Sequence, residues 1–196
     1  HTGVVGDKTT ITDKVECTNL IVGYEYTIKG KLYNTETGGA VLENGKEITA
    51  EKTFTADKNN MTIDLKFTIN SNSLKGETIV VFEDLYNNDI KIATHSDLSD
   101  ENQQVSYPKV GTTANDKETN SKSGVTGAIA TIIDTVECTN LIVGYEYTVK
   151  GKLYNTDTEK AFLDNGNEVV AEKTFIANKK DMTIELEFIF NSLSLE

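Results

Sequence analysis

The sequence of 196 residues has little of what marks several large protein classes. It contains no tryptophan, one proline and two cysteines, and no stretch approaches the roughly 18 apolar residues of a membrane-spanning helix. We therefore expect no membrane insertion, and the lack of tryptophan weakens the case for a sugar-binding site. The sequence has 19 basic and 31 acidic residues, which gives a net charge of −12, and it has no basic patch. We therefore expect no nucleic-acid partner.

What the sequence does contain is a second copy of itself. Residues 10–75 recur without a gap at 131–196, about two thirds of these positions are identical, and the run 15–27 recurs unbroken at 136–148. The shift of 121 residues is the size of one ordinary domain rather than of a solenoid repeat. The chain opens part-way into one repeat and stops part-way through the next, so we expect it to be a piece of a longer array.

The two cysteines, Cys17 and Cys138, occupy the same place in successive repeats. Equivalent positions of separate domains lie a domain length apart, which is too far for a disulfide. We expect each cysteine to be a small buried apolar residue. An intermolecular disulfide is the alternative that the sequence leaves open.

The pattern along each repeat predicts strands and no helices. Short runs rich in Val, Ile, Thr, Tyr and Phe alternate with turn clusters such as 34–39, which is typical of an all-β sandwich. We predict tandem Ig-like, Greek-key β-sandwich domains over 1–108 and 109–196, placed end to end by a short linker around Pro108. The strands that matter most for function are expected near 10–17, 78–86, 90–95, 103–107, 109–115 and 129–138.

Period-2 alternation places acidic side chains on faces that are otherwise apolar. Asp13 falls in line with three apolar residues of its strand, and its copy Asp134 does the same in the second repeat. Glu83 lies on a strand that is apolar on both faces, so this strand should be central and Glu83 at least partly buried. Two buried carboxyls close together make protonation of one almost obligatory. An edge position in partial solvent is the alternative for Asp13.

The same alternation separates two pairs of neighbouring polar residues. Gln103 and Thr112 share their faces with apolar residues, whereas Gln104 and Thr113 face the other way. Facing therefore selects Gln103 and Thr112 as the inward-pointing pair. His95 is the only histidine inside the repeat pattern, and a lone histidine is more often a surface or packing residue than a catalyst.

Four segments occur in a fixed order along the chain. They are Ile11-Thr-Asp-Lys-Val15 with the strand that follows it, Val80-Val-Phe-Glu83, His95-Ser-Asp-Leu-Ser-Asp100-Glu-Asn-Gln103, and Val110-Gly-Thr-Thr-Ala114. In this order the chain resembles the T-Q ester bond domains, or VaFE repeats, of Gram-positive surface proteins, and the resemblance covers almost the whole chain. It departs at Gln104, where the family usually has Thr or Ser, and at Cys17 and Cys138, where it often has Tyr.

The resemblance implies a cross-link that the protein makes by itself. In the family, a threonine hydroxyl of the first strand attacks the carboxamide of a glutamine in the last strand, ammonia leaves, and an intramolecular ester remains. Carried over by motif, the residues that would form the cross-link are Gln103 and Thr112. The assisting residues would be Asp13, Glu83, His95 and Asp100 in the first repeat and Asp134 in the second.

Elementary chemistry is compatible with this reaction. A hydroxyl is a weak nucleophile and an amide a poor electrophile, so the site needs a base, for which His95 is the candidate. It also needs polarisation of the amide carbonyl, which a protonated carboxyl in a dry site can provide. Adjacent strands would hold the two groups in contact. The individual roles of Asp13 and Glu83 stay open.

Each repeat carries only part of this machinery. The first repeat, 1–108, contains Gln103 but no threonine strand, and the second, 109–196, contains Thr112 but ends before its own V-x-F-E and His…Gln segments. Gln103 and Thr112 belong to different modules and should not react together. We expect either that the parent chain continues on both sides or that neighbouring chains complement each other by strand addition.

These features favour a structural role, as a stalk repeat of a cell-surface adhesin or fibre stabilised by Thr–Gln esters. The partners would be neighbouring repeats, and the location would be extracellular, on the cell wall or in a surface fibre. The cross-link forms once, so we do not expect an enzyme. An esterase or glycosidase is disfavoured because the acids point into a core.

The alternative function is a ligand-binding sandwich for a glycan or a host protein. We expect no cofactor and no metal site. The loops rich in Asn and Asp permit Ca²⁺, but the same residues are ordinary turn formers.

Overall fold

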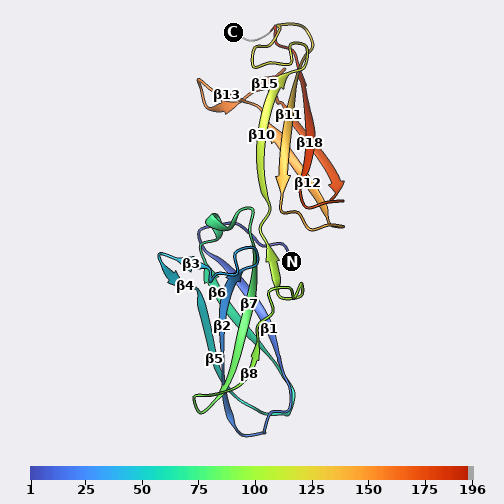
Figure 1. Ribbon diagram of the computed structural model, residues 1–196. Helices are drawn as coiled ribbons and strands as arrows, with labels where there is room; N and C mark the ends of the chain where they lie inside the picture. The colour runs from blue at the N-terminus through green and yellow to red at the C-terminus, as the bar shows by residue number, and fades with distance from the viewer. Residues whose placement is uncertain (194–196) are drawn as a thin grey trace. The chain divides into compact units, whose positions relative to one another are not determined.

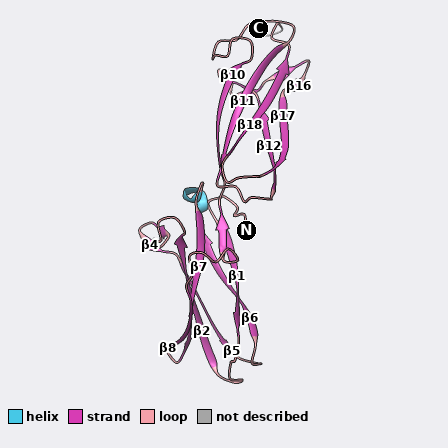
Figure 2. Ribbon diagram, turned by 45° about the vertical axis from the view of Figure 1, so that its right-hand side comes forward, coloured by secondary structure: helices cyan, strands magenta, loops and turns pink. Residues whose placement is uncertain are grey.

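The structure, a computed structural model, describes residues 1–193 and consists almost entirely of β-strands (Figures 1 and 2). The only helical element in this part of the chain is a short 3-10 turn, η1 (Ser71–Leu74). This architecture confirms the all-β fold class expected from the sequence. The chain divides into two compact units, unit 1 (His1–Pro108) and unit 2 (Lys109–Glu196).

Unit 1 is a sandwich of two sheets with one hydrophobic core between them. The smaller sheet pairs β1 (Thr9–Cys17) with β6 (Met61–Ile69), antiparallel. The larger sheet has the order β5-β2-β7-β8, and β9 pairs with the beginning of β7. Its strands, with the added hairpin β3–β4, are β2 (Glu25–Asn34), β3 (Leu42–Glu43), β4 (Lys46–Glu47), β5 (Thr49–Thr55), β7 (Thr78–Asn87), β8 (Ile90–His95) and β9 (Gln104–Ser106).

Unit 2 repeats part of this arrangement and adds one strand. Its sheets have the orders β10-β11-β18 and β12-β17, with two short hairpins, β13–β14 and β15–β16. The strands are β10 (Lys109–Asp116), β11 (Ala130–Thr139), β12 (Glu146–Lys152), β13 (Tyr154–Asn155), β14 (Lys160–Ala161), β15 (Leu163–Asp164), β16 (Asn167–Glu168), β17 (Val170–Ile176) and β18 (Met182–Phe190).

The sequence repeat relates the strands of the two units. Shifted by 121 positions, β1 and β6 correspond to β11 and β18. The strand β10 has no counterpart in unit 1, and within the described residues of unit 2 nothing corresponds to β7, β8 or β9. Each unit therefore displays strands that the other does not.

The alternation of side chains explains where the core lies. In β6 every second residue from Ile63 to Ile69 is apolar and at most 5% exposed, whereas the residues between them are polar. In β7 the buried residues Ile79, Val80 and Val81 occupy both faces, and the strand pairs with β2 on one edge and with β8 and β9 on the other. The expectation that this strand is central is confirmed.

The last strand of unit 1 is shorter than expected. Strand β9 begins at Gln104, not at 103, because the amide of Gln103 donates to the carbonyl of Asp100 (3.0 Å) and so takes part in a turn. The predicted strand over 103–107 also ends one residue earlier, at Ser106, although the amide of Tyr107 still donates to the carbonyl of Glu77 (2.8 Å).

Gly30 of β2 allows the two sheets to approach closely. A Cβ atom at this position would lie 2.5 Å from Leu65 and 2.7 Å from Phe67, both in the opposite sheet. Gly151 meets the equivalent residues of β18 in unit 2. Because Gly30 is also the cross-strand partner of Glu83, this close contact lies directly beside the candidate site.

The cysteines are free and buried, as expected from the sequence. Cys17 is 5% and Cys138 2% exposed, and burial raises the pKa of each thiol. Among the described residues, no helix has the length and apolar character needed to cross a membrane.

Candidate functional site

Asp13 and Glu83 meet in the interior of unit 1 from opposite sheets. Asp13 lies on β1 opposite Leu65, and Glu83 lies on β7 opposite Gly30. The two side chains are 8% and 5% exposed, and their carboxyl groups are joined by a hydrogen bond. Asp13 does lie on an edge strand, as the alternative for it supposed, but its side chain is buried and not in partial solvent.

The environment keeps a proton on this pair. Burial above all, together with the negative charge of Asp13, raises the pKa of Glu83 to about 9. Burial also raises the pKa of Asp13, although the hydrogen bond with Glu83 works in the opposite direction. At neutral pH the pair of carboxyl groups therefore retains a proton, which belongs to the pair as a whole.

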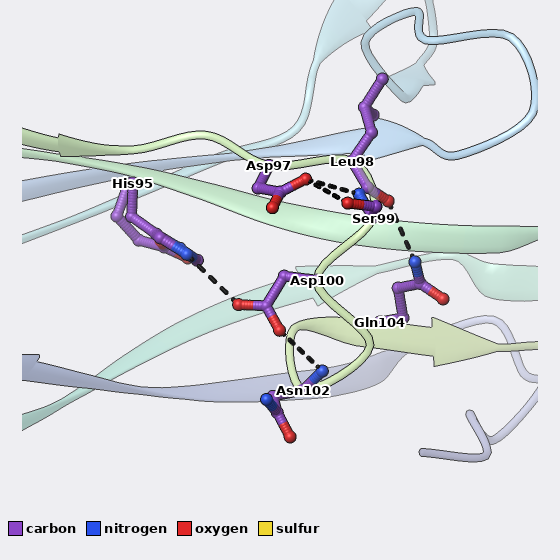
Figure 3. Close-up of polar contacts among 8 residues, drawn as sticks. His95, Asp97, Leu98, Ser99, Asp100, Asn102 and Gln104 are labelled. Carbon is purple, nitrogen blue, oxygen red and sulfur yellow. Dashed lines mark hydrogen bonds and ion pairs between the residues drawn. The ribbon is translucent and has the colours of Figure 1, made fainter.

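His95 bridges Glu83 to a second carboxyl group. It is the cross-strand partner of Glu83, and its Nδ1 lies 3.2 Å from Glu83 Oε2. Its Nε2 lies 3.2 Å from Oδ2 of Asp100, a contact drawn in Figure 3. Both ring nitrogens are thus occupied by carboxyl oxygens, while 46% of the side chain is exposed.

A chain of tight turns after β8, drawn in Figure 3, positions Asp100 and leads on to Gln103. Asp97 Oδ1 accepts bonds from the amide and hydroxyl of Ser99, and Asp100 Oδ1 accepts the amide of Asn102 at 2.9 Å. Aspartate favours such turns because its carboxylate can accept the amide two residues further on. The two turns therefore place Asp100 beside His95 and Gln103 on the side of the chain that faces the core.

Gln103 lies in an open groove of unit 1 together with the other predicted residues. The groove has a volume of about 1030 Å³ and is lined by β1 from Thr9 to Glu16 and by Glu83, His95, Asp100 and Gln103, among others. The side chain of Gln103 hydrogen-bonds Asp13. The structure therefore brings all five predicted residues of unit 1 together.

Two features of the groove leave hydrogen-bonding groups without partners in this structure. In its sheet β1 is paired on one edge only, with β6. Asp13 Oδ2 and Glu83 Oε1 are buried and have no hydrogen-bond partner within the described residues. Buried carboxyl oxygens are normally satisfied, so an unpartnered pair beside a free strand edge marks a place for a hydrogen-bonding ligand.

Unit 2 has a strand on the corresponding edge. Its β10 pairs antiparallel with β11, the counterpart of β1, and Thr112 lies close enough to Asp134 to lower the pKa of that carboxyl. Asp134 Oδ1 nevertheless has no hydrogen-bond partner among the described residues. Thr112 is opposite Val136, two residues from Asp134 on the same face of the sheet. The expectation of a core position for Thr112 is not met in this structure, where the side chain is exposed.

Lys122 belongs to this half-site but was not foreseen. Its Nζ donates to the carbonyl of Ala114 at 2.5 Å, and Ala114 is the cross-strand partner of Asp134. Burial raises the pKa of Asp134, while the positive charge of Lys122 and the nearby Thr112 lower it. The loop that carries Lys122 has no periodicity, so only the fold reveals this contact.

Each unit thus carries an equivalent aspartate with a different polar neighbour. Asp13 and Asp134 are equivalent, because they are 121 positions apart and lie on corresponding strands. One contacts a glutamine side chain and the other a threonine hydroxyl. Within residues 1–193, no group of three or more His, Cys, Asp or Glu side chains is arranged to hold a metal ion.

The comparisons with known proteins agree with this geometry. The family described as T-Q ester bond containing domain matches residues 1–107 and again residues 108–196. Two adjacent matches cover the whole chain, and the protein therefore belongs to this family. No curated protein matches the sequence.

A solved structure also matches the chain. It is a bacterial adhesin from Mobiluncus mulieris containing intramolecular disulfide, isopeptide and ester bond cross-links. The match has 15% sequence identity and a TM-score of 0.44, and it covers 91% of this chain and 68% of the adhesin chain. This similarity is too low to transfer properties of that adhesin to the present protein.

Proposed function

We propose that this protein is a structural module of a cell-surface adhesin or fibre, stabilised by self-made ester bonds between threonine and glutamine side chains. The observation that carries the proposal is the pair of half-sites. Asp13 of unit 1 contacts Gln103, and its equivalent Asp134 contacts Thr112. A β10-type strand on the free edge of β1 would bring both reacting groups to one aspartate.

The register of unit 2 says where the reacting threonine would lie. Thr112 is opposite Val136 in the β10–β11 ladder, which corresponds to Val15 in unit 1. A threonine opposite Val15 is two residues from Asp13 on the same face, within reach of its unpartnered Oδ2. Pairing along the strand would supply the proximity that an uncatalysed reaction of an alcohol with an amide does not have.

The charges of the site suit this reaction. The carboxyl pair retains a proton, so one member can donate a hydrogen bond to the developing oxyanion while the other accepts the threonine proton. His95 has no free ring nitrogen for the hydroxyl, so we assign it a positioning role between Glu83 and Asp100. The bond from threonine oxygen to the glutamine Cδ forms, the C–N bond breaks, and ammonia leaves with the transferred proton.

A cross-link of this kind suits a module that resists tension. The threonine would enter on the first strand of a domain and the glutamine precedes the last, so the ester would join both ends of one sandwich. The bond would close a loop about as long as one domain. By analogy with disulfides, closing such a loop covalently stabilises the domain by about 4–5 kcal/mol. Tandem modules of this type would act as a stalk, extracellular and attached to the cell wall, and each would react once rather than turn over.

The proposal can be tested with a synthetic strand. The full chain is incubated with a peptide of residues 109–117, and intact-mass spectrometry records the products. We expect an adduct with the summed mass of both components less about 17 Da for ammonia, with the bond mapped to Gln103. A peptide with Val in place of Thr112 is the matched control and should not react. Absence of any adduct from the natural peptide would refute the ester chemistry.

A further inference from the structure

We propose that a short segment that precedes β1 and β11 positions the threonine strand and the glutamine strand of a repeat against each other. This clip segment comprises residues 1–4 in unit 1 and their copies, residues 122–125, in unit 2. The inference rests on the proposed function and adds positioning residues to the same site. They are Gly3 with its copy Gly124 on the segment, and Asp116 at the end of the threonine strand.

The clip segment is anchored in the same way in both units. The Gly6 amide donates to the hydroxyl of Ser71 at 3.1 Å, and its copy, the Gly127 amide, donates to the hydroxyl of Ser192 at 2.8 Å. In each unit the serine amide also donates to the glycine carbonyl, at 3.0 Å. The two copies therefore occupy equivalent places, and the contacts of one inform about the other.

In unit 1 the clip segment pairs with the last strand. The Gly3 amide donates to the carbonyl of Ser106 at 2.8 Å, and the Ser106 amide donates to the carbonyl of His1 at 2.7 Å. These bonds form a parallel bridge between the segment and β9. Gly3 also lies against the ring of Tyr107, which a Cβ atom at this position would approach to 2.4 Å. The segment is thus fixed to the strand end that follows Gln103.

In unit 2 the clip segment contacts the end of the threonine strand. A Cβ atom at Gly124 would lie 3.0 Å from Oδ2 of Asp116, which is buried at the end of β10. Asp116 Oδ1 accepts the Thr119 amide at 2.9 Å. This bond and a weaker one from the Val125 amide lower the pKa of Asp116. The segment is thus held to the same strand that carries Thr112.

One glycine therefore leaves room for both strands. The missing side chain accommodates the Tyr107 ring at Gly3 and the Asp116 carboxylate at Gly124. In a repeat that contains both strands, a single segment would hold the two strand ends and fix their register. Register decides the reaction, because a strand displaced by one residue turns its threonine to the other face of the sheet.

The threonine side is tested with synthetic peptides of residues 109–117, so that the chain itself is unchanged. Intact-mass spectrometry measures the rate at which each peptide becomes linked to Gln103 at saturating concentration. The copy of the Val125 amide in unit 1 is the Val4 amide, which the Asp116 carboxylate of the bound peptide would meet. We expect the Asp116→Ala peptide to react at least about tenfold more slowly, because it loses a hydrogen bond to a charged group.

Two further peptides separate positioning from charge and from binding. Asp116→Asn retains an oxygen that accepts the same amide, so it should recover most of the rate. Thr113→Ala changes the opposite face of the strand and should react like the natural peptide. In the Asp116→Ala peptide the half-saturating concentration should change less than the maximal rate, because the backbone pairing with β1 is retained. An Asp116→Asn peptide as slow as Asp116→Ala would overturn the positioning role.

The glutamine side is tested in the full chain. Gly3→Ala should slow the reaction of the natural peptide by about fivefold or more, because its methyl group would displace Tyr107 and with it β9. Gly6→Ala is the matched control, since a Cβ atom there meets only a methyl of Thr9 at 3.4 Å. Hydrogen exchange in β6 should be the same in both variants as in the wild type. An unchanged rate in Gly3→Ala would contradict the role of this glycine, and the peptides decide the proposal if Gly3→Ala alters β6.

The outcomes distinguish this inference from the proposed function. If the natural and Asp116→Ala peptides become linked to Gln103 at the same rate, the clip segment does not position the threonine strand, and the proposed function stands. If no peptide becomes linked, both proposals fall.

Discussion

The raised pKa of Glu83 should make unit 1 less stable as the pH rises, and Glu83→Gln should remove this dependence. The pKa of Glu83 is about 9 in the folded state against an ordinary value of 4.5. Between these values the folded state binds a proton that the unfolded state has released. The contribution of Glu83 to stability is therefore fully present below the lower value and is lost as the pH rises through the upper one.

The magnitude follows from the proton linkage. While only the folded state carries the proton, the free energy of unfolding falls by about 1.4 kcal/mol per pH unit. From pH 5.5 to pH 8.5 the loss is up to about 4 kcal/mol. A neutral amide at position 83 bears no such penalty, so at pH 7 the variant should be more stable than the wild type by about 3 kcal/mol.

Hydrogen exchange followed by mass spectrometry can measure this effect in one unit at a time. The free energy of opening is obtained for peptides of β7 in unit 1 and of β18 in unit 2, in wild type and variant, at several pH values. We expect a falling profile for β7 in the wild type, a much flatter one in Glu83→Gln, and no difference between the proteins in β18. Glu101→Gln, which removes an exposed charge, is the control and should follow the wild type. A wild-type β7 profile that is flat or rises would refute the assignment of a proton to the carboxyl pair.

Three further substitutions test the packing and the second half-site. Gly30→Ala should destabilise unit 1 by about 1–3 kcal/mol through overpacking against the opposite sheet, measured by denaturant titration, whereas Gly111→Ala, with open space around it, should have little effect. Lys122→Met should raise the pKa of Asp134, measured by NMR titration of the carboxyl carbon, because it removes the nearby positive charge; an unchanged value would contradict that role. Ser71→Ala should lower the free energy of unfolding by about 1–3 kcal/mol. The fully buried hydroxyl of Ser71 donates to a carbonyl of the N-terminal segment and accepts the Gly6 amide. An unchanged free energy of unfolding in the same titration would contradict the role of these buried hydrogen bonds.

The residues on the inner faces could be found from the sequence because strands have a fixed period. Alternation alone placed Asp13 and Glu83 inward, and both are buried. The prediction works for Asp13 because one face of its strand is apolar, and for Glu83 because its strand is apolar on both faces, so each carboxyl group must enter the core. It does not require knowledge of which strands are neighbours.

The meeting of these carboxyls could not be derived in the same way. Asp13 and Glu83 belong to different sheets, so their contact depends on how the sheets pack and on the space that Gly30 leaves. The role of His95 depends on a turn after its strand that brings Asp100 back to the ring. From the sequence, His95 was the candidate base for the threonine hydroxyl, whereas the structure shows both nitrogens of its ring in contact with carboxyl oxygens.

The unpartnered carboxyl oxygens of Asp13 and Glu83 lower the stability of unit 1, but they serve the reaction that we propose. A buried carboxyl that holds its proton lowers stability at neutral pH, and natural cores avoid such groups unless they are satisfied. An incoming strand would satisfy Asp13 Oδ2 and Glu83 Oε1 and would also exclude water from the groove. The same event would therefore relieve the penalty and bring the threonine to Gln103. The reaction can begin only when the strand is seated, so the chemistry is restricted to correctly paired strands.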